Sequence, residues 1–389
     1  MFSERTSFIG APTSFSEAVA ARRRESGALL DLTESNPTAV GLPPLPDAMR
    51  TALAGPSVLR YVPDPAGPRA IREAVAEHYA RLGVAVDPDH LRLSASTSEA
   101  YGWLLKLLCD AGDAVLVAHP SYPLLDDLAR FEGVALRAVP STFAGRWELD
   151  VEGFAAAADS GARAIALVHP NNPTGAYVSR DEREALCALA RARGLALVVD
   201  EVFLEYPLRD GVRVESFARC DDVLTFTLAG LSKSLALPQM KLGWVHVSGP
   251  AELRDEALRR LEHIADSYLS VGAPVLAAAP AWLAQATALQ APVRARIATN
   301  LATLRRVFDA RSAATLRAPE GGWSAVLRLP ATDTDEGWAR TLLSRGVVVH
   351  PGYLFDATSE TCVVLSLIVD PGVFAAGIEA LREAVDGSG

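Results

Sequence analysis

The chain has 389 residues, with 37 lysines and arginines against 47 aspartates and glutamates, and so a formal net charge of −10. Half of its residues are hydrophobic and 22% are charged, which supplies a folded core and excludes a mainly disordered chain. Because an acidic chain is a poor general binder of nucleic acid, we expect no nucleic-acid partner.

The N-terminal half begins with a proline-rich stretch over residues 37–46, which predicts an extended, ordered segment. Helical patterns and short apolar runs then alternate. Helices are predicted over residues 69–82, 98–108 and 181–193, and strands over 114–118, 164–168, 195–199 and 223–227. Ser179 is the expected N-cap of the third helix. This order predicts an α/β domain with a largely parallel sheet, its strands buried on both faces.

The last third of the chain has a different pattern. A long amphipathic helix is predicted over residues 293–308, followed by a strand at 323–329, a helix at 334–344, strand pieces near 347 and at 363–368, and a final helix at 373–385. This is a smaller α+β unit. We therefore expect an N-terminal segment (1–45) packing with the small domain, a large α/β domain (46–280) and a small C-terminal domain (281–389).

The cysteines and the chain termini exclude several other classes. Four cysteines lie far apart, with no CxxC pair and no Cys/His cluster, so neither a zinc site nor a disulfide framework is predicted: Cys109, Cys187, Cys220 and Cys362. The first ten residues lack the apolar run of a secretory signal. The longest uncharged apolar stretch, residues 271–284, is shorter than the roughly 20 residues that span a bilayer and contains two prolines. We expect a cytoplasmic protein with no metal and no membrane partner.

Polar side chains follow three of the predicted strands. His169–Gly175 follows the second strand, Asp200–Phe203 the third, and Leu228–Lys233 the fourth. Each segment alone has a structural explanation, as a turn, a helix cap or a surface pair. Together they bring an amide, a carboxylate and an amine to the sheet edge where ligands of such folds bind.

These three groups suit one kind of cofactor chemistry. A lysine forms a Schiff base with an aldehyde, and a carboxylate keeps a pyridine nitrogen protonated so that the ring withdraws electrons. An amide donates a hydrogen bond to the ring's phenolic oxygen. The sequence therefore predicts a site for pyridoxal 5'-phosphate (PLP).

The motifs along the chain also carry a resemblance to a known family. They are YVPDPAG (61–67), RAIREAV (69–75), STSEA (96–100), GD (112–113), HPSYP (119–123), NNPTG (171–175), DEVF (200–203), SK (232–233), KLGW (241–244) and GGW (321–323). In this order they resemble the class I/II aminotransferases, PLP-dependent enzymes of fold type I like aspartate and alanine aminotransferase. The resemblance implies a large domain with a mostly parallel seven-stranded sheet, a smaller α+β domain and a homodimer with shared active sites.

The resemblance also implies roles for individual residues. Lys233 would be the Schiff-base lysine and proton carrier, Asp200 the partner of the ring nitrogen, and Asn172 the donor to the phenolic oxygen. Tyr122 would stack on the ring, and Tyr61 would reach the phosphate of the neighbouring subunit's cofactor. The full implied cofactor-binding set is Thr97, Ser98, Tyr122, Asn172, Asp200, Phe203, Ser232, Lys233, Lys241 and Tyr61.

Three cofactor positions depart from the family pattern. Lys241 stands where an arginine usually holds the phosphate, which keeps the charge but loses the two-pronged hydrogen bond. Gly230 stands where a phosphate-binding serine is common. Phe203 replaces a tyrosine that donates to the phenolic oxygen, so we expect the lysine-bound cofactor to keep its proton to higher pH. The offset of Tyr206 does not favour it as a replacement donor.

A fourth departure concerns the substrate. Val364 occupies the position of the family's arginine for the substrate α-carboxylate, and no arginine or lysine occurs between Arg345 and Arg382. An unpaired carboxylate in a dry pocket is costly. Either another group replaces the arginine or the substrate has no free carboxylate there. The substitutes considered are His350, Asn36 and Thr38, and the arginines Arg60, Arg69 and Arg328, for which a solvated or structural role is favoured.

Three functions remain open from the sequence. The first is a PLP-dependent aminotransferase that moves an amino group from an amino acid or atypical amine to a 2-oxo acid or other carbonyl acceptor. The second is a PLP-dependent lyase or decarboxylase on the same scaffold, since fold does not fix the reaction. The third is a non-catalytic binding protein on a degenerate aminotransferase fold.

Overall fold

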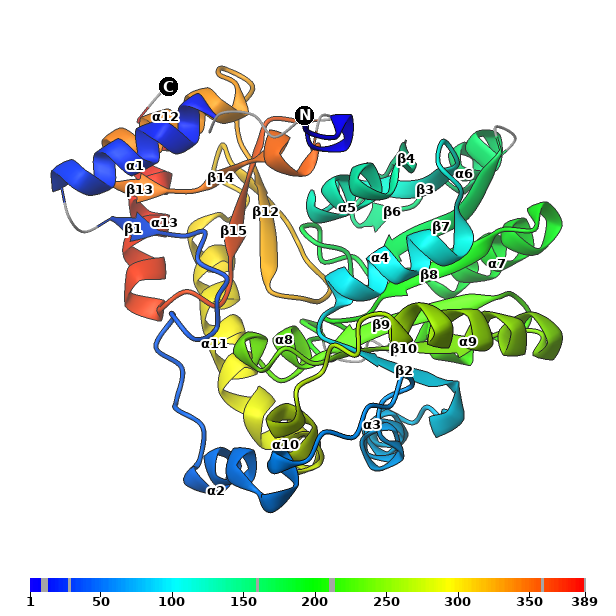
Figure 1. Ribbon diagram of the computed structural model, residues 1–389. Coiled ribbons are helices and arrows are strands. Elements are labelled where there is room, and N and C mark those ends of the chain that lie inside the picture. The colour runs from blue at the N-terminus through cyan, green and yellow to red at the C-terminus, as the bar shows by residue number, and fades with distance from the viewer. Residues whose placement is uncertain (8–12, 27–28, 159–160, 210–213, 358–359, 388–389) are drawn as a thin grey trace.

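A seven-stranded sheet forms the centre of the larger part of the molecule (Figure 1). In this computed structural model, the structure describes residues 1–7, 13–26, 29–158, 161–209, 214–357 and 360–387. The strand order is β2 (Leu91–Ser94), β10 (Gly243–Ser248), β9 (Thr225–Gly230), β8 (Ala196–Asp200), β7 (Ala162–Val168), β3 (Ala114–His119) and β4 (Ala135–Pro140). β10 runs antiparallel to both neighbours and all other pairs are parallel. The prediction of a mostly parallel seven-stranded sheet is confirmed.

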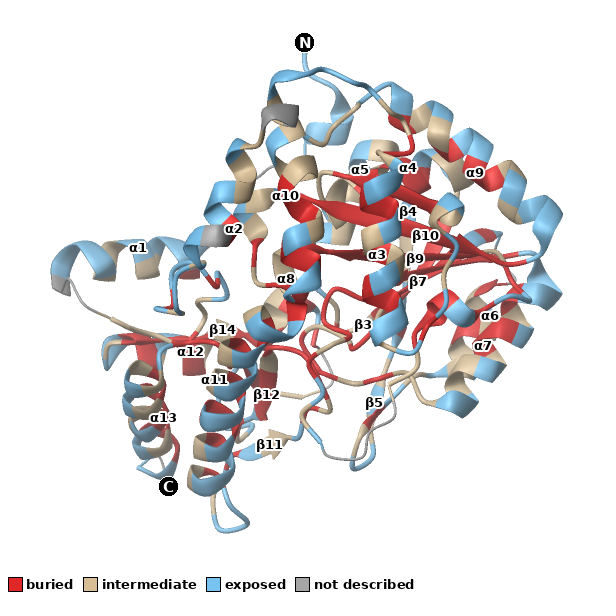
Figure 2. Cartoon of the chain, turned by 90° about the horizontal axis from the view of Figure 1, so that it is seen from below, coloured by how far each residue is buried: buried red, intermediate tan, exposed pale blue. Residues whose placement is uncertain are grey.

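Helices cover both faces of this sheet. One apolar cluster joins alternate strand residues to α4 (Thr97–Leu108), α5 (Leu124–Glu132) and α9 (Ala251–Asp266), and another joins the intervening residues to α6 (Val151–Ala158) and α7 (Arg180–Arg193). Except for the edge strand β4, the strands are therefore buried on both sides, as Figure 2 shows. α3 (Arg69–Arg81) and α10 (Ala273–Ala284) pack together beside β2 and β10.

The smaller part contains a four-stranded antiparallel sheet. Its order is β11 (Thr315–Arg317), β12 (Ser324–Arg328), β15 (Cys362–Ser366) and β14 (His350–Pro351). Three helices pack against it: α11 (Ala286–Val307), α12 (Asp335–Ser344) and α13 (Pro371–Asp386). β1 (Leu30–Asp31) pairs in parallel with β13 (Val347–Val348), and Phe15 of α1 (Ser14–Ser26) joins the same core. The N-terminal segment thus lies beside the small sheet (Figure 1).

The two cores meet inside α11. Ala286 belongs to the cluster of α3 and α10, whereas residues from Val293 onward belong to the core of the small sheet. The expected domain boundary near residue 280 stays a prediction. The helix expected from residue 293 begins at Ala286 and contains Pro292, so the proline does not stop it.

The remaining elements are short. They are α2 (Asp47–Thr51), α8 (Leu231–Ser234), the hairpin β5 (Thr142–Phe143) and β6 (Trp147–Glu148), and seven 3₁₀ turns: Glu4–Thr6, Ala52–Ala54, Pro56–Leu59, Pro88–His90, Phe217–Arg219, Pro238–Met240 and Gly352–Phe355. Within the described ranges, no helix has the length and apolar character needed to cross a membrane.

Candidate active site

A cavity lies where the carboxyl ends of β7, β8 and β9 face the small sheet. Its walls combine the N-terminal segment, the large sheet with α4 and α5, and strands β12, β14 and β15. Most of the site residues expected from the sequence line this one cavity: Thr97, Ser98, Tyr122, Asn172, Asp200, Phe203, Ser232, Lys233, Lys241 and His350. Tyr61, Asn36 and Thr38 do not line it.

Asp200 is the last residue of β8 and is 7% exposed. Its Oδ1 accepts a hydrogen bond from the amide of Val202 at 3.0 Å, and the Tyr101 hydroxyl also bonds to the carboxyl group. Burial raises the pKa of Asp200 to about 7, against the opposing effects of Val202, Lys233 and Tyr101. A protonated ring nitrogen facing this carboxylate would supply the counter-charge that burial demands.

Lys233 lies in α8, directly after β9. Its Nζ is 5.4 Å from the centroid of the Trp323 ring. Burial lowers the pKa of Lys233, and the negative charges of Asp200 and Glu34 oppose this shift without cancelling it. The site therefore favours the neutral, nucleophilic amine more than water does.

Tyr206 holds the backbone at Lys233. Its hydroxyl donates to the carbonyl oxygens of Lys233 and Ser234 at 3.1 and 3.0 Å, and Gln290 Nε2 donates to the Ser234 carbonyl at 3.0 Å. Tyr206 is 1% exposed and does not line the cavity. Its hydroxyl is therefore committed to the main chain and does not replace the one missing at Phe203.

Asn172 follows β7 in the turn that Gly175 closes with a φ of +71°. The Asn172 Oδ1 accepts a hydrogen bond from Ser324 Oγ of β12 at 3.1 Å. Because the oxygen is engaged, the amide NH₂ is the group left to donate into the cavity, as a phenolic oxygen requires. A Cβ at Gly175 would lie 2.6 Å from the Gly321 carbonyl oxygen, so this close approach requires glycine.

The N-terminus of α4 forms the cationic end of the cavity together with Lys241. Ser96 caps the helix by accepting from Glu99 N at 3.1 Å, so the free amides of the first turn point outward at Thr97 and Ser98. A helix N-terminus beside a lysine is suited to a phosphate group. A Cβ at Gly243 would lie 3.2 Å from Thr97 N and 3.0 Å from Ser94 Oγ, so glycine lets β10 approach this turn.

Gly230 has a structural reason to lack a side chain. A Cβ there would lie 2.9 Å from the Leu242 carbonyl oxygen and 3.0 Å from Gly243 Cα. A serine would force β9 and β10 apart at their paired ends. Ser232, Lys241 and the helix amides are therefore the donors that this end of the cavity would offer to a phosphate group.

The aromatic residues lie around the middle of the cavity. Phe203 is 7% exposed and meets Trp323 edge-on, with ring centroids 5.5 Å apart. Tyr122 is 48% exposed, lines the cavity and has its ring 6.5 Å from that of Phe355. A planar ring bound between Asp200 and Asn172 would therefore meet aromatic walls.

Two residues of the N-terminal segment lie outside the cavity. Asn36 Oδ1 accepts hydrogen bonds from Thr38 N at 3.0 Å and from Thr38 Oγ1 at 2.7 Å, so both side chains close on one another at the surface. Thr33 and Ser35 of the same segment line the cavity instead. The extended backbone alternates its side chains between the two sides, and the sequence did not reveal which side faces inward.

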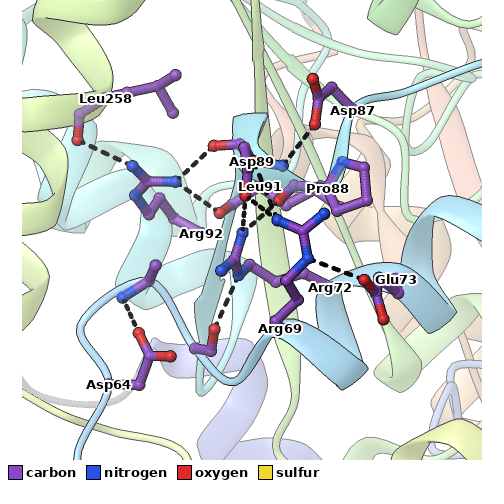
Figure 3. Close-up of polar contacts among 12 residues, drawn as sticks. Asp64, Arg69, Arg72, Glu73, Asp87, Pro88, Asp89, Leu91, Arg92 and Leu258 are labelled. Atoms are coloured by element: carbon purple, nitrogen blue, oxygen red, sulfur yellow. Dashed lines mark hydrogen bonds and ion pairs between the residues drawn. The ribbon is translucent and has the colours of Figure 1, made fainter.

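The arginines considered as substitutes for the missing one are engaged elsewhere or exposed. Arg69 binds Glu73 and Asp89, both at 2.8 Å (Figure 3). Arg328 lies 3.7 Å from Glu360. None of the described residues that line the cavity is an arginine.

Tyr61 projects from an anchored surface segment. Its side chain is 81% exposed and lines a separate groove with Arg60 and Trp103. The segment ends at Gly67, whose carbonyl accepts from Arg72 Nε at 2.8 Å, while Arg72 Nη1 donates to the Pro88 carbonyl at 2.7 Å (Figure 3). Tyr61 therefore does not line the active-site cavity, and its exposed side chain projects from an anchored segment.

Several polar residues of the cavity were not predicted as site residues from the sequence, among them Tyr101, Ser324 and Ser366. Tyr101 lies four residues after Thr97 on the same face of α4, a spacing that could have revealed it. Ser324 and Ser366 are opposite each other on β12 and β15, and their pairing is not visible in the sequence. Ser366 Oγ is buried without a hydrogen-bond partner in the described part of the chain.

Comparison with known proteins assigns the family. The sequence pattern of the family described as aminotransferase class I and II matches residues 28–375. The arginine–pyruvate transaminase AruH of Pseudomonas aeruginosa is 33% identical over 349 residues, which cover 87% of this chain and 83% of that protein. The S-alkyl-thiohydroximate lyase SUR1 of Arabidopsis thaliana is 30% identical over 48% of this chain and 40% of its own length.

The fold agrees with solved structures of this type. An alanine aminotransferase from Pyrococcus furiosus superposes with a TM-score of 0.89 at 20% identity, covering all of both chains. The chain belongs to the class I and II aminotransferases. It is a PLP-dependent transaminase of fold type I.

Proposed function

We propose that the cavity between the two sheets is the transamination site, with Lys233 as its reactive amine. The observation that supports this most is the joint placement of Lys233, the buried Asp200 and the Asn172 amide around one cavity. When bound, PLP supplies an aldehyde that takes up the amino group and a ring that withdraws electrons from the reacting carbon.

Each side chain of the cavity has a separate role in this proposal. Asp200 would pair with a protonated ring nitrogen, and the Asn172 amide would donate a hydrogen bond to the phenolic oxygen. Lys233 Nζ accepts the proton from the substrate carbon that bears the amino group and later returns one. The lowered pKa of Lys233 suits this, because a neutral amine is the form that can accept a proton. Ser232, Lys241 and the α4 amides hold the phosphate.

The amino group would pass from an amino donor to a carbonyl acceptor, either a 2-oxo acid or another carbonyl compound. The name of the relative AruH includes a 2-oxo acid, pyruvate, which supports the first of these two classes. A second candidate is a lyase on the same scaffold, which the partial similarity to the lyase SUR1 favours. Release of ammonia and a keto acid without a new amino compound would identify a lyase. Release of carbon dioxide would identify a decarboxylase.

We further propose a homodimer in which Tyr61 reaches the partner's cofactor phosphate. Leu59, Tyr61 and Val62 are 88%, 81% and 71% exposed. Such exposed apolar side chains support an interface with a partner subunit at this segment. We place the protein in the cytoplasm, since its four cysteines are free thiols, as suits a reducing compartment.

The assignment of Lys233 is tested by trapping the cofactor. Borohydride reduction of the holoenzyme, followed by proteolysis and mass spectrometry, should locate the pyridoxyl group on the peptide that contains Lys233. Lys233→Ala should lose both the label and turnover, while Lys106→Ala on the surface of α4 should keep both. A label on any other lysine would contradict the assignment.

A further inference from the structure

The wall of the cavity formed by the small sheet and the N-terminal segment carries no lysine or arginine among the described residues. It is formed by Thr33, Ser35, His350, Phe355, Val364 and Ser366. The two lysines of the cavity belong to the opposite side, on α8 and just before β10. In the proposed function, this wall faces the substrate groups attached to the reacting carbon.

Val364 and His350 lie side by side on this wall. They are paired residues of the antiparallel strands β14 and β15, so their side chains emerge on the same face. Val364 is 2% exposed, and its branched side chain offers no charge or hydrogen bond. Burial lowers the pKa of His350, against a smaller opposing effect of Asp31, so the imidazole is neutral near pH 7.

A substrate carboxylate placed on this wall would lose its hydrating water. It would find no lysine or arginine to pair with among the described residues of the wall.

The wall nevertheless offers unused hydrogen-bonding capacity. Ser366 Oγ is buried, lines the cavity and has no partner among the described residues. The His350 ring adds a neutral donor and acceptor beside it. These groups match an uncharged polar substituent better than a carboxylate, since a buried polar group in a native protein is expected to have a partner.

We propose that the amino substrate of this enzyme is an amine without a free carboxylate on its amino-bearing carbon, with an amide, hydroxyl or second amine in that place. The proposal rests on the transamination site described above. It assigns Val364 as a residue that determines specificity, with Ser366 and His350 binding the uncharged substituent.

The test compares two probes that differ only in this charge, L-alanine and L-alaninamide. Each is titrated into the holoenzyme at equal concentration of unprotonated amine, and the change in the visible band gives a dissociation constant and a rate. We expect the amide to bind at least tenfold more tightly and to react faster. L-Alanine binding as tightly as the amide would overturn the proposal, whatever reaction follows.

Two variants test the residues themselves. Val364→Arg should shift the preference toward L-alanine by tenfold or more, whereas Val364→Leu, which adds no charge, should keep the wild-type preference. If Val364→Arg does not fold, Ser366→Ala serves instead, and should weaken the binding of L-alaninamide without weakening that of L-alanine. Unchanged preference in Ser366→Ala would contradict the assignment of that residue.

One alternative source of a cation is the proposed partner subunit, because Arg60 precedes the exposed Tyr61. Arg60→Ala should leave the ratio of the two dissociation constants unchanged. A selective loss of L-alanine binding in this variant would overturn the proposal by showing that the partner supplies the carboxylate site. Failure of transamination itself appears separately, as ammonia release from either probe without a new amino compound.

Discussion

Phe203 lacks the hydroxyl group that a tyrosine would place at this point of the cavity. The ring lines the cavity and packs against Trp323, but it has no hydroxyl to donate to a phenolic oxygen. Tyr206 cannot compensate, because its hydroxyl already binds two backbone carbonyls. Asn172 is therefore the donor that this side of the cavity provides.

Restoring the hydroxyl should change the titration of the bound cofactor. In Phe203→Tyr, a hydrogen bond to the phenolic oxygen stabilises its anionic form, so the midpoint of the visible-band titration should move to lower pH. The absorbance of the holoenzyme across pH measures this midpoint, with Phe203→Leu as the control that adds no donor. An unchanged midpoint in Phe203→Tyr would mean that another donor already serves the oxygen.

Ser324 orients the Asn172 amide through a 3.1 Å hydrogen bond. Ser324→Ala leaves the amide free to turn its oxygen toward the cavity, and should weaken cofactor binding by about 1 kcal/mol, or roughly fivefold. Equilibrium dialysis with PLP gives the dissociation constant. Thr303→Ala, which removes an exposed hydroxyl from α11, should leave it unchanged. Equal affinity in wild type and Ser324→Ala would refute this orienting role.

Three of the site residues predicted from the sequence share one property. Asp200 ends a buried strand, and Asn172 and Lys233 follow buried strands. The apolar runs of these strands are plain in the sequence, and parallel strands end at one edge. Ser324 and Ser366 come from an antiparallel sheet far along the chain, and their approach depends on how that sheet docks. Tertiary packing of this kind leaves no local signal.

At the scale of elements, a buried polar network joins α3, α8 and α11 behind the reactive lysine. His78 Nε2 lies 2.8 Å from Glu205 Oε1, and Gln290 Nε2 lies 2.7 Å from Glu205 Oε2 and 3.0 Å from the Ser234 carbonyl. Burial works to raise the pKa of Glu205, but His78, Gln290 and Arg294 outweigh it and hold that pKa below its usual value.

Breaking this network should loosen α8. Gln290→Met keeps the volume but leaves Glu205 and the Ser234 carbonyl short of a donor, which should lower the free energy of unfolding by about 1–3 kcal/mol. Urea unfolding measures the change, with Gln285→Met on the exposed end of the same helix as a control. A loss no larger than that of the control would show that the network contributes nothing to stability.

Continuous apolar runs predicted several strands of the large sheet, whereas β2, β4 and β10 were not predicted. β7 and β8 were predicted to within two residues at either end. β2 was missed because it contains Arg92, which is buried only because Glu262 and backbone carbonyls bind its guanidinium. The start of α11 was missed because Pro292 lies inside the helix.

At the scale of the whole molecule, buried histidines make stability depend on pH. Burial lowers the pKa of both His169 and His246 to about 3, from the value of 6.5 that a solvated histidine has. The unfolded chain takes up these protons first, so the stabilising effect is complete above pH 6.5 and is lost as pH falls toward 3. Each histidine contributes a slope of about 1.4 kcal/mol per pH unit in that window.

His246 is the better histidine to test, because it lies on β10 and does not line the cavity. The free energy of unfolding should fall less between pH 6 and pH 5 in His246→Gln than in wild type. The difference should be about 1.4 kcal/mol, the contribution of one proton taken up on unfolding. Urea unfolding at pH 7, 6 and 5 gives the slope, and His263→Gln on α9 is the control. Equal slopes in wild type and His246→Gln would contradict this account.

One single-turnover measurement tests most directly whether this molecule transfers an amino group with Lys233 as the proton carrier. The holoenzyme is mixed with L-alaninamide, and the visible band, the carbonyl product and free ammonia are followed together. We predict loss of the band with one equivalent of carbonyl product and no ammonia, then recovery of the band when excess pyruvamide, an acceptor that also has no carboxylate, is added. Release of ammonia in step with the carbonyl product, or formation of carbonyl product by Lys233→Ala at the wild-type rate, would contradict it.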